Sequence, residues 1–422
     1  MDSSRLIAQL SQEVPAFSEF VDALRASSLT AWLVGGCIRD LLLGRQCADV
    51  DVVCIEDPSD WARSWAKGRG HWFWLDQQRR HSRILLPEGV SFDVAPLRAP
   101  TIEADLLARD FTVNALAVPI GETGQLLDPL NGIIDLSHRC LRICSDRSFS
   151  DDPLRILKGA RHAAVFAFSF DEHSLNSMSD HASLINNVAA ERVRDELFAL
   201  VNVRDLFNTM QTLSDAGVLV ALFGSPDSEW IAQRHRQYHR LIYDRIDDFC
   251  HRHQTSVVAA LQQQQNLFLL SSFLRTYSPT RYVSNVRKLR LSREQQRMLK
   301  ALQSDMTGEW LTSIDRLITE RRLALAVEQL NPCGLQRVFY WGWCIGKIPE
   351  HQVVDLLEAY WTQEKNGRIP HLLDGHLIAH FVDHHQIGKW QHQIKLQEIE
   401  GRISHQDEAL VWLKTHLPID KN

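Results

Sequence analysis

The most constraining feature of this sequence is the stretch 31–53, in which paired glycines are followed by two alternating aspartates. The apolar run Ala31–Val34 ends at Gly35-Gly36, and a second apolar run carries Asp49 and Asp51. Glycines at the end of a strand let backbone N–H groups approach a polyphosphate, and the start of the following helix adds a favourable partial charge. Residues i and i+2 of a strand share one face, so the two carboxylates are expected side by side. Such a pair repels unless a cation lies between its members, and we expect it to hold one or two Mg²⁺ ions that bind a triphosphate.

Three further segments resemble, together with residues 31–53, the motifs of one enzyme family. Residues 107–117 read LARDFTVNALA, residues 150–168 read SDDPLRILKGARHAAVFAF, and residues 190–197 read AERVRDEL. In this order the four segments resemble the class II tRNA nucleotidyltransferase and bacterial poly(A) polymerase family, which is part of the DNA polymerase β nucleotidyltransferase superfamily. The resemblance implies an enzyme that adds nucleotides to an RNA 3′ end without a nucleic-acid template.

The resemblance also implies roles for individual side chains. Asp49 and Asp51 would hold the metal ions, and Asp93 would be a third carboxylate that ligates metal or acts as a base, unless it is a surface aspartate on a strand. The implied nucleotide-binding residues are Gly35, Gly36 and Arg39 for the phosphates, Arg109, Asp110 and Asn114 for phosphate and ribose, Asp152 and Arg155 for the base, and Lys158 and Arg161 for the triphosphate. Asp152 and Arg155 are three residues apart and would share one helix face, although this spacing by itself is more typical of an intrahelical salt bridge.

The segment between the last predicted head strand and Asp110 bears on the reaction product. Only APTIEADLLAR separates Arg98 from Asp110, whereas family members that add a complete CCA end have a longer flexible loop here. The resemblance therefore favours a CC-adding enzyme that uses CTP and leaves the terminal adenosine to a separate A-adding enzyme. A full CCA-adding enzyme that also uses ATP, and a poly(A) polymerase, remain alternatives. Ala108 stands where the family usually has the first arginine of Arg-Arg-Asp, which puts nucleotide affinity in question. A non-catalytic RNA-binding relative is disfavoured because both metal-binding aspartates are present.

The hydrophobic patterns predict an α+β protein whose first part has a mixed or antiparallel sheet and whose remainder is helical. We expect a polymerase-β-like nucleotidyltransferase head at 1–145, a helical neck with the nucleotide-selecting helix at 146–224, a helical RNA-binding body at 225–365 and a tRNA-binding tail at 366–422. Short runs at 72–75, 82–86 and 91–95 read as strands of the head. Pro15 interrupts an amphipathic helical pattern at 3–28 and is expected to split or kink it.

The composition bears on where the protein resides in the cell and on what it binds. The chain has no secretory signal pattern and no apolar stretch long enough to cross a bilayer, so a cytoplasmic protein without membrane contact is expected. Its eight cysteines lack the spacing of a disulfide framework. The net charge of −6 averages over two basic clusters, at 234–240 and at 281–300, that we interpret as RNA-binding patches. Tyr238 and Tyr282 lie beside these clusters and are candidates for stacking on unpaired bases.

Overall fold

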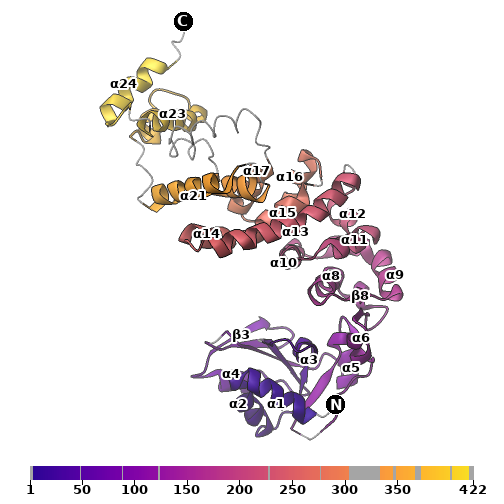
Figure 1. Cartoon of the computed structure of the whole chain (residues 1–422). Coiled ribbons are helices and arrows are strands. Elements are labelled where there is room, and N and C mark those ends of the chain that lie inside the picture. Colours follow the sequence, from indigo (N-terminus) through magenta and orange to yellow (C-terminus); the bar gives the residue numbers. More distant parts are fainter. Residues whose placement is uncertain are drawn as a thin grey trace. The chain divides into compact units, whose positions relative to one another are not determined.

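The structure is a computed structural model that describes residues 3–47, 49–87, 89–121, 124–226, 229–275, 277–303, 333–345, 348–365, 372–399 and 402–417. The chain divides into two compact units, Met1–Ser225 and Pro226–Asn422 (Figure 1). The predicted boundary between body and tail, at 366, lies outside the described residues, and the four-part division stays a prediction. Every cysteine is a free thiol, in agreement with the sequence prediction. Among the described residues, no helix combines the length and the apolar character that crossing a membrane requires.

The first unit is built on a mixed sheet with strand order β3-β4-β5-β2-β1-β6, which confirms the predicted α+β class. Strands β2 and β5 pair in parallel, and the other neighbours pair antiparallel. The strands are β1 (Ala31–Val34), β2 (Asp49–Cys54), β3 (His71–Asp76), β4 (His81–Leu85), β5 (Ser91–Pro96) and β6 (Ala117–Ile120). The parallel pair lies at the centre, so the two predicted carboxylates of β2 lie next to β5.

Helices cover one face of this sheet, which we call the back face. They are α1 (Ser3–Glu13), α2 (Pro15–Arg25) and α4 (Ser59–Ala66), and Pro15 starts the second helix as a residue of its first turn, which confirms the predicted split. Phe20 of α2 stacks on Phe92 of β5 with ring centroids 4.3 Å apart, and Trp65 of α4 meets both rings edge-on. Phe20 and Phe92 are completely buried, so this aromatic contact anchors the helices on the sheet.

The opposite face, which we call the open face, carries Asp49 and Asp51 and is only half covered. Over β1 and β6, Val34 and Ala117 pack with Ile102 and Leu106 of α5 (Ile102–Leu107). The 3₁₀ turn η1 (Thr112–Asn114) follows α5 and leads into β6. Over β3 and β4, by contrast, apolar side chains remain exposed to solvent. The covered half therefore packs β1 and β6 against α5, and the uncovered half leaves the strands beside the aspartates accessible to solvent.

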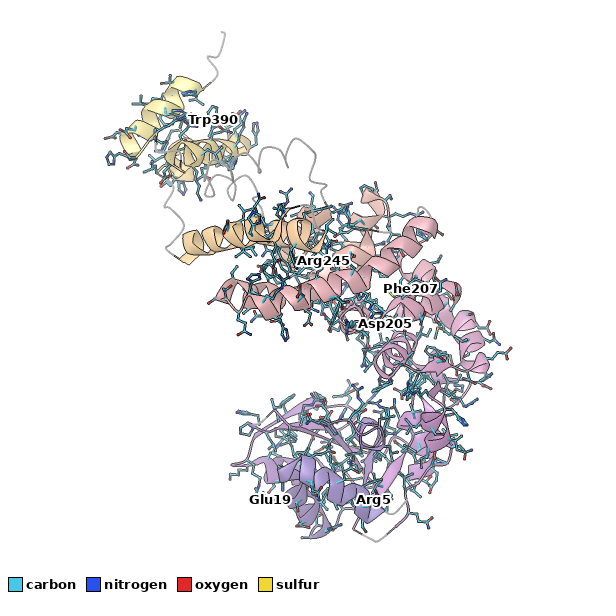
Figure 2. The ribbon with its side chains drawn as sticks, viewed as in Figure 1. Arg5, Glu19, Asp205, Phe207, Arg245 and Trp390 are labelled. Atoms are coloured by element: carbon cyan, nitrogen blue, oxygen red, sulfur yellow. The ribbon has the colours of Figure 1, made fainter. Side chains whose placement is uncertain are left out.

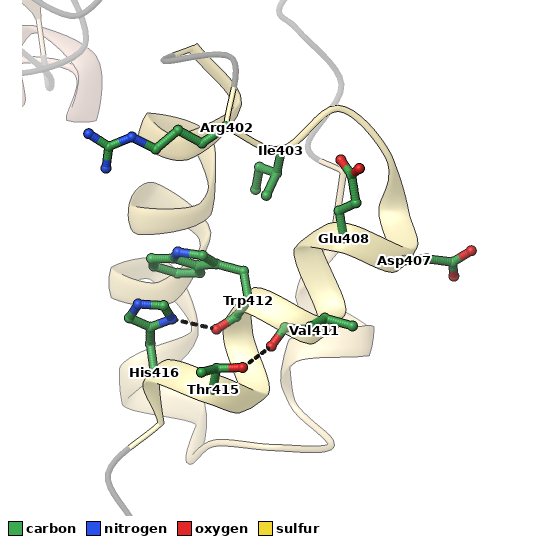
Figure 3. A pocket seen from close by; sticks show the side chains of 8 residues that line it. All are labelled: Arg402, Ile403, Asp407, Glu408, Val411, Trp412, Thr415 and His416. Carbon is green, nitrogen blue, oxygen red and sulfur yellow. Dashed lines mark hydrogen bonds between the residues drawn. The ribbon is translucent and has the colours of Figure 1, made fainter.

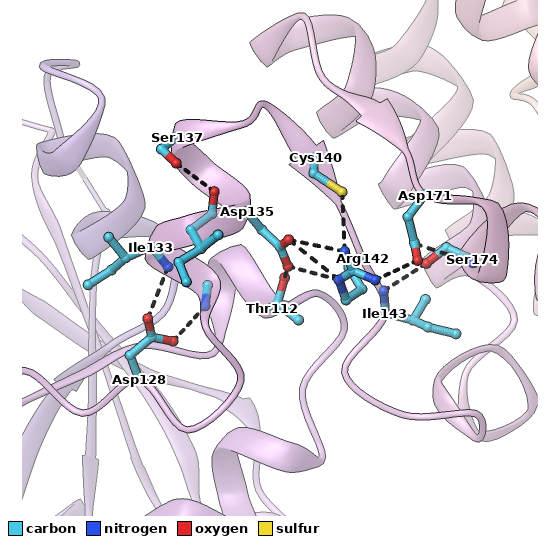
Figure 4. A network of polar contacts seen from close by, with 12 residues as sticks. Thr112, Asp128, Ile133, Asp135, Ser137, Cys140, Arg142, Ile143, Asp171 and Ser174 are labelled. Carbon is cyan, nitrogen blue, oxygen red and sulfur yellow. Dashed lines mark hydrogen bonds and ion pairs between the residues drawn. The ribbon is translucent and has the colours of Figure 1, made fainter.

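After the sheet, the first unit continues in helices and one short parallel strand pair. Its remaining elements are α3 (Gly36–Leu42), α6 (Gly132–Ser137), β7 (Cys140–Leu141), α7 (Ser148–Asp151), α8 (Arg155–Phe166), β8 (Ser169–Phe170), α9 (Glu172–His181), η2 (Ala182–Asn187), α10 (Ala190–Val201), α11 (Phe207–Asp215) and α12 (Val218–Phe223). A polar network joins the sheet region to these helices (Figure 4). Asp135 accepts a 2.7 Å hydrogen bond from Thr112, and Arg142 bridges Asp135 to Asp171, the N-cap of α9.

The second unit is helical throughout its described part. Its elements are α13 (Glu229–Arg252), α14 (Ser256–Gln262), α15 (Gln265–Leu274), α16 (Pro279–Lys288), α17 (Arg293–Gln303), α20 (Gly334–Arg337), the π-helix η3 (Val338–Cys344), α21 (Glu350–Lys365), α22 (Gly375–Ile378), η4 (His384–Gln386), α23 (Ile387–Ile399) and α24 (Gln406–His416). Arg245 of α13, labelled in Figure 2, donates to the carbonyl oxygens of Trp343 and Cys344. The indole of Trp343 donates back to the Arg245 carbonyl at 2.7 Å. These reciprocal bonds attach the π-helix to α13.

The C-terminal helices have a small core of their own. Leu373, Ile378, Ile394, Ile403 and Leu413 form a cluster that is separate from the aromatic packing around the π-helix. At the edge of this cluster, Trp412 stacks on His416 with centroids 4.2 Å apart, in a shallow pocket between α24 and the segment at Arg402 (Figure 3).

Candidate active site

The two aspartates of β2 lie on the open face next to a third carboxylate. Asp51 pairs with Asp93 of β5 in the parallel register, so their side chains are neighbours on one face. Burial and the negative charge of Asp93 raise the pKa of Asp51 to about 6. Asp49 is more exposed and accepts a hydrogen bond from the Ser91 hydroxyl. The crowding of carboxylates around Asp51 is the environment that a bound divalent cation would relieve.

Asp93 itself is already paired, which the sequence reasoning missed. Arg83 of β4 binds both of its oxygens, at 2.6 and 2.8 Å, and His81 lies 3.7 Å away. Burial alone would raise the pKa of Asp93, but hydrogen bonds from Arg83 and His81 lower it instead. Residues 83 and 93 lie at equal distances from the turn that joins β4 and β5, so the hairpin register was the signal that could have revealed this pair. The role of Asp93 as a metal ligand or base stays a prediction.

Gly35 brings the main chain against the aspartate pair. Its φ is +79°, a conformation that favours glycine, and a Cβ added there would lie 3.1 Å from Nη1 of Arg109 and 3.2 Å from Oδ2 of Asp51. A Cβ on Gly36 would lie 3.3 Å from Nη2 of Arg39. The bare backbone of Gly35 therefore lies against the Asp51 carboxylate and the Arg109 guanidinium, and that of Gly36 lies against the Arg39 guanidinium.

Arg39 is not free to reach outward, because it is held inside a hydrogen-bonded chain. Its side chain is buried, donates to Asn114 at 2.7 Å and to both oxygens of Asp40 at 3.0 Å, and lies with its guanidinium carbon 4.2 Å from the centre of the Phe166 ring. Asn114 in turn donates to Asp110 at 2.9 Å. The predicted phosphate ligand thus connects α3, η1 and α8.

Asp110 is the centre of this chain. Lys158 of α8 binds its other oxygen at 2.6 Å. Burial alone would raise the pKa of Asp110, but Lys158 and His162 hold it well below its ordinary value. The neighbouring Arg109 donates through Nε and Nη2 to the buried Asp105, which leaves Nη1 directed at Gly35. Arg109 and Lys158 therefore lie close enough to Asp51 to lower its pKa, and Asp110 and Asn114 are connected to them through Lys158. Their roles in nucleotide binding stay a prediction.

The predicted base-reading pair is arranged differently from the expectation. Asp152 is not on a helix face, because it has extended geometry (φ −146°, ψ 96°) between α7 and α8, and Arg155 is the first residue of α8. Asp152 accepts from Arg192 of α10 at 3.0 Å, and Arg155 donates to the carbonyl oxygens of Ala108, Arg109 and Ser148. The expected shared helix face was wrong, since a residue before proline avoids the helical conformation. Arg161 pairs with Glu196 of α10 at 2.9 Å, so it too has a partner within the protein.

The connection that precedes α5 is short and fixed. It runs only from Leu97 to Thr101, between the end of β5 and the start of α5. The Leu97 amide donates to the Cys54 carbonyl at 2.8 Å, the Arg98 amide donates to Asp105 at 2.9 Å, and Thr101 caps α5 by accepting from the Ala104 amide at 3.2 Å. The place where a longer loop was considered is therefore a capped turn.

In the second unit, three cations line a groove between α16 and α17. Arg287, Arg297 and Lys300 border it, and all three are exposed. Tyr282, which we considered for base stacking, is buried, and its hydroxyl donates to the Leu299 carbonyl at 3.0 Å, so that prediction was wrong. The side chain of Tyr238 lies outside the described residues.

Comparison with known proteins finds two matching family models and several relatives. A model of the poly A polymerase head domain matches residues 31–142, and a model of the probable RNA and SrmB-binding site of polymerase A matches residues 167–229. A CC-adding tRNA nucleotidyltransferase of Geobacter sulfurreducens is 43% identical over 225 residues, which cover 53% of this chain and 52% of that protein. An A-adding tRNA nucleotidyltransferase of Deinococcus radiodurans is 38% identical over 195 residues, or 45% of this chain and 44% of that protein. The chain thus spans about half the length of these curated relatives.

The fold also has a match among solved structures. The structure of the Thermotoga maritima CCA-adding enzyme complexed with tRNA matches with a TM-score of 0.63 and 20% sequence identity, and the match covers 99% of each chain. Residues 31–142 and 167–229 are thus similar to the head domain and the RNA-binding segment of poly A polymerases, and the fold is similar to that of a CCA-adding enzyme.

Proposed function

We propose that this protein is a tRNA nucleotidyltransferase that transfers CMP from CTP to the 3′ hydroxyl of tRNA. The RNA oxygen attacks the α-phosphorus and forms a new P–O bond, the bond to the β-phosphate oxygen breaks, and pyrophosphate leaves while the hydroxyl proton passes to a base or to solvent. The observation that carries this proposal is the Asp49–Asp51 pair on the open face, beside the Gly35 backbone and Arg109. Carboxylates next to an approachable main chain and a cation suit phosphoryl transfer, in which positioning and charge stabilisation do most of the work.

The donor set suits Mg²⁺. Asp51 has a raised pKa because it is buried next to another carboxylate, and two hard oxygen donors project from one strand. Asp49 and Asp51 would be the protein ligands, because both project from β2 onto the open face, whereas Asp93 is held by Arg83. Mg²⁺ commonly takes one or two carboxylates and completes its shell with phosphate oxygens and water. When bound, it would neutralise charge that develops on the triphosphate.

The nucleotide would lie along the β1 side of the aspartate pair. We propose that Gly35, Gly36 and Arg109 hold the phosphates, with Lys158 close by, and that Asp110 and Asn114 face the ribose. Arg39 and Arg161, which pair with other side chains, would position this surface and not bind phosphate directly. Asp152 and Arg155 would read the cytosine edge, with Arg192 orienting Asp152.

We further propose that two cytidines are added and that a separate A-adding enzyme completes the end. Two observations support this: the turn 97–101 is short and capped, and the relative from Geobacter sulfurreducens bears the name of a CC-adding enzyme. A full CCA-adding enzyme that also takes ATP, or a poly(A) polymerase, is the alternative. The basic groove between α16 and α17 would contact tRNA phosphates, and its binding would weaken as salt rises.

The reaction class is tested by Asp49→Asn with tRNA that lacks its last three nucleotides, CTP and Mg²⁺. We expect CMP transfer to fall by at least about a thousandfold, since metal-assisted charge stabilisation is worth several kcal/mol. Asp60→Asn, a change of the same chemistry on the exposed surface of the back-face helix α4, is the matched control and should keep full activity. Transfer by Asp49→Asn at the wild-type rate, with an unchanged circular-dichroism spectrum, would contradict the proposal.

A further inference from the structure

The uncovered half of the open face bears an apolar surface that continues the line of the carboxylates. Phe73 of β3 pairs with Arg83, Arg83 with Asp93, and Asp93 with Asp51, so these four side chains form one row across the sheet. In the next row, Leu85 of β4 pairs with Ser91, which pairs with Asp49. Phe73 is 40% exposed and Leu85 is 38% exposed, and Leu75, at the bulge of β3, is 43% exposed.

This surface is not explained by packing within the described chain. The opposite side of the same strands is used: Trp72 and Trp74 of β3 contact each other, and Arg63 of α4 lies 4.2 Å from the centre of the Trp72 ring. Phe73 and Leu85 face the other way, toward solvent, on the side that bears the aspartates. Exposed apolar side chains grouped on one face beside a candidate site commonly mark a binding surface.

The geometry of phosphoryl transfer indicates what binds there. The attacking and leaving oxygens lie roughly in line on opposite sides of the phosphorus. Gly35 and Arg109, which would hold the leaving pyrophosphate, lie on the β1 side of β2. The attacking hydroxyl must therefore come from the other side, where β5, β4 and β3 follow in order. Three strand spacings, about 14 Å, separate β2 from β3, the strand that carries Phe73; this is within the reach of the last nucleotides of an RNA.

We propose that Phe73, with Leu75 and Leu85 beside it, is the platform on which the unpaired base at the 3′ end of the RNA stacks. This inference rests on the proposed function and adds to it the location of the acceptor. Arg83, which binds Asp93 through Nε and Nη2, adds a positive charge to the same row of side chains, between Phe73 and the aspartates. Stacking accepts any base, because every base has a π-face. That tolerance suits an acceptor whose last base changes after each addition.

The test compares Phe73→Ala, Phe73→Trp and the wild type. The alanine variant should raise KM for the RNA by about fivefold or more, as expected for one lost stacking contact, and leave KM for CTP unchanged. Phe73→Trp should restore the RNA KM, because it keeps an aromatic face. Ile134→Ala removes an exposed apolar side chain from α6 and should change neither constant.

A second measurement does not depend on turnover. An RNA with 2-aminopurine as its 3′-terminal base should lose fluorescence on binding to the wild type and to Phe73→Trp, but much less with Phe73→Ala. An unchanged RNA KM together with unchanged quenching in Phe73→Ala would overturn the platform, even if the wild type adds cytidines normally. Quenching without any nucleotide transfer by the wild type would instead overturn the proposed reaction. A concentration-dependent dimer that Phe73→Ala dissociates, with no effect on RNA, would also contradict the platform.

Discussion

Replacement of Gly35 by alanine tests whether the bare backbone at the end of β1 is needed for nucleotide transfer. Gly35 has φ +79°, and a Cβ there would approach Arg109 to 3.1 Å and Asp51 to 3.2 Å, so both side chains would have to shift by a few tenths of an ångström. The strained backbone alone should cost about 1–3 kcal/mol of folding free energy. The displacement of two groups that face the triphosphate should lower kcat/KM for CTP by at least about tenfold, because a shift of about 1 Å costs about a hundredfold.

Gly44 provides the matched control. Its φ is +68°, and a Cβ there would meet no atom within 4 Å, so Gly44→Ala strains the backbone without touching the site. Urea denaturation should show a loss of stability in both variants, larger in Gly35→Ala because two side chains must also shift. CMP incorporation should fall only in Gly35→Ala. If Gly35→Ala kept a kcat/KM within twofold of that of Gly44→Ala, the close approach of the backbone to Asp51 and Arg109 would have no part in catalysis.

Three further predictions concern α8 and α10, the helices next to the proposed nucleotide site. Arg192→Ala removes the ion pair with Asp152 and should raise KM for CTP about fivefold in steady-state kinetics. The free energy of unfolding should change by less than about 1 kcal/mol in thermal unfolding, because the ion pair is exposed. An unchanged KM would contradict this prediction. Phe166→Leu removes the ring beneath Arg39 and should cost about 1 kcal/mol in urea denaturation, whereas no loss would show that the contact is not stabilising. Burial holds the pKa of His162 well below its usual value, so the unfolded chain takes up the proton first and stability falls as the pH drops below about 6.5. His162→Gln should remove up to about 1.4 kcal/mol per pH unit of that slope between pH 6.5 and 5, and an unchanged slope would contradict the assignment.

Local patterns predicted much of the frame. The alternation in β2 placed Asp49 and Asp51 on one face, because side chains of a strand alternate whatever the strand pairs with. Pro15 split the first helical segment, since proline fits the start of a helix and not its interior. The paired glycines were also identified correctly as the end of a strand, and the positive φ of Gly35 gives the physical reason for glycine there.

The sequence-based predictions that were wrong or incomplete depended on strand pairing or on the tertiary environment of a residue. The partner of Asp93 is Arg83, and their contact follows from the register of a hairpin whose turn had to be placed first. Asp152 lies outside the helix because Pro153 follows it. This local signal was overlooked because the flanking residues have a helical pattern. Tyr282 was misassigned because neighbouring basic residues say nothing about whether an aromatic ring points inward.

The product formed on tRNA that lacks its last three nucleotides tests the central claim most directly. Purified protein is given Mg²⁺ with CTP alone, ATP alone, or both, and the products are separated at single-nucleotide resolution. The account predicts growth by two cytidines that stops there even when ATP is present, because the capped turn 97–101 replaces the longer loop. Growth by three nucleotides with both substrates, or a long tail from ATP alone, would contradict it.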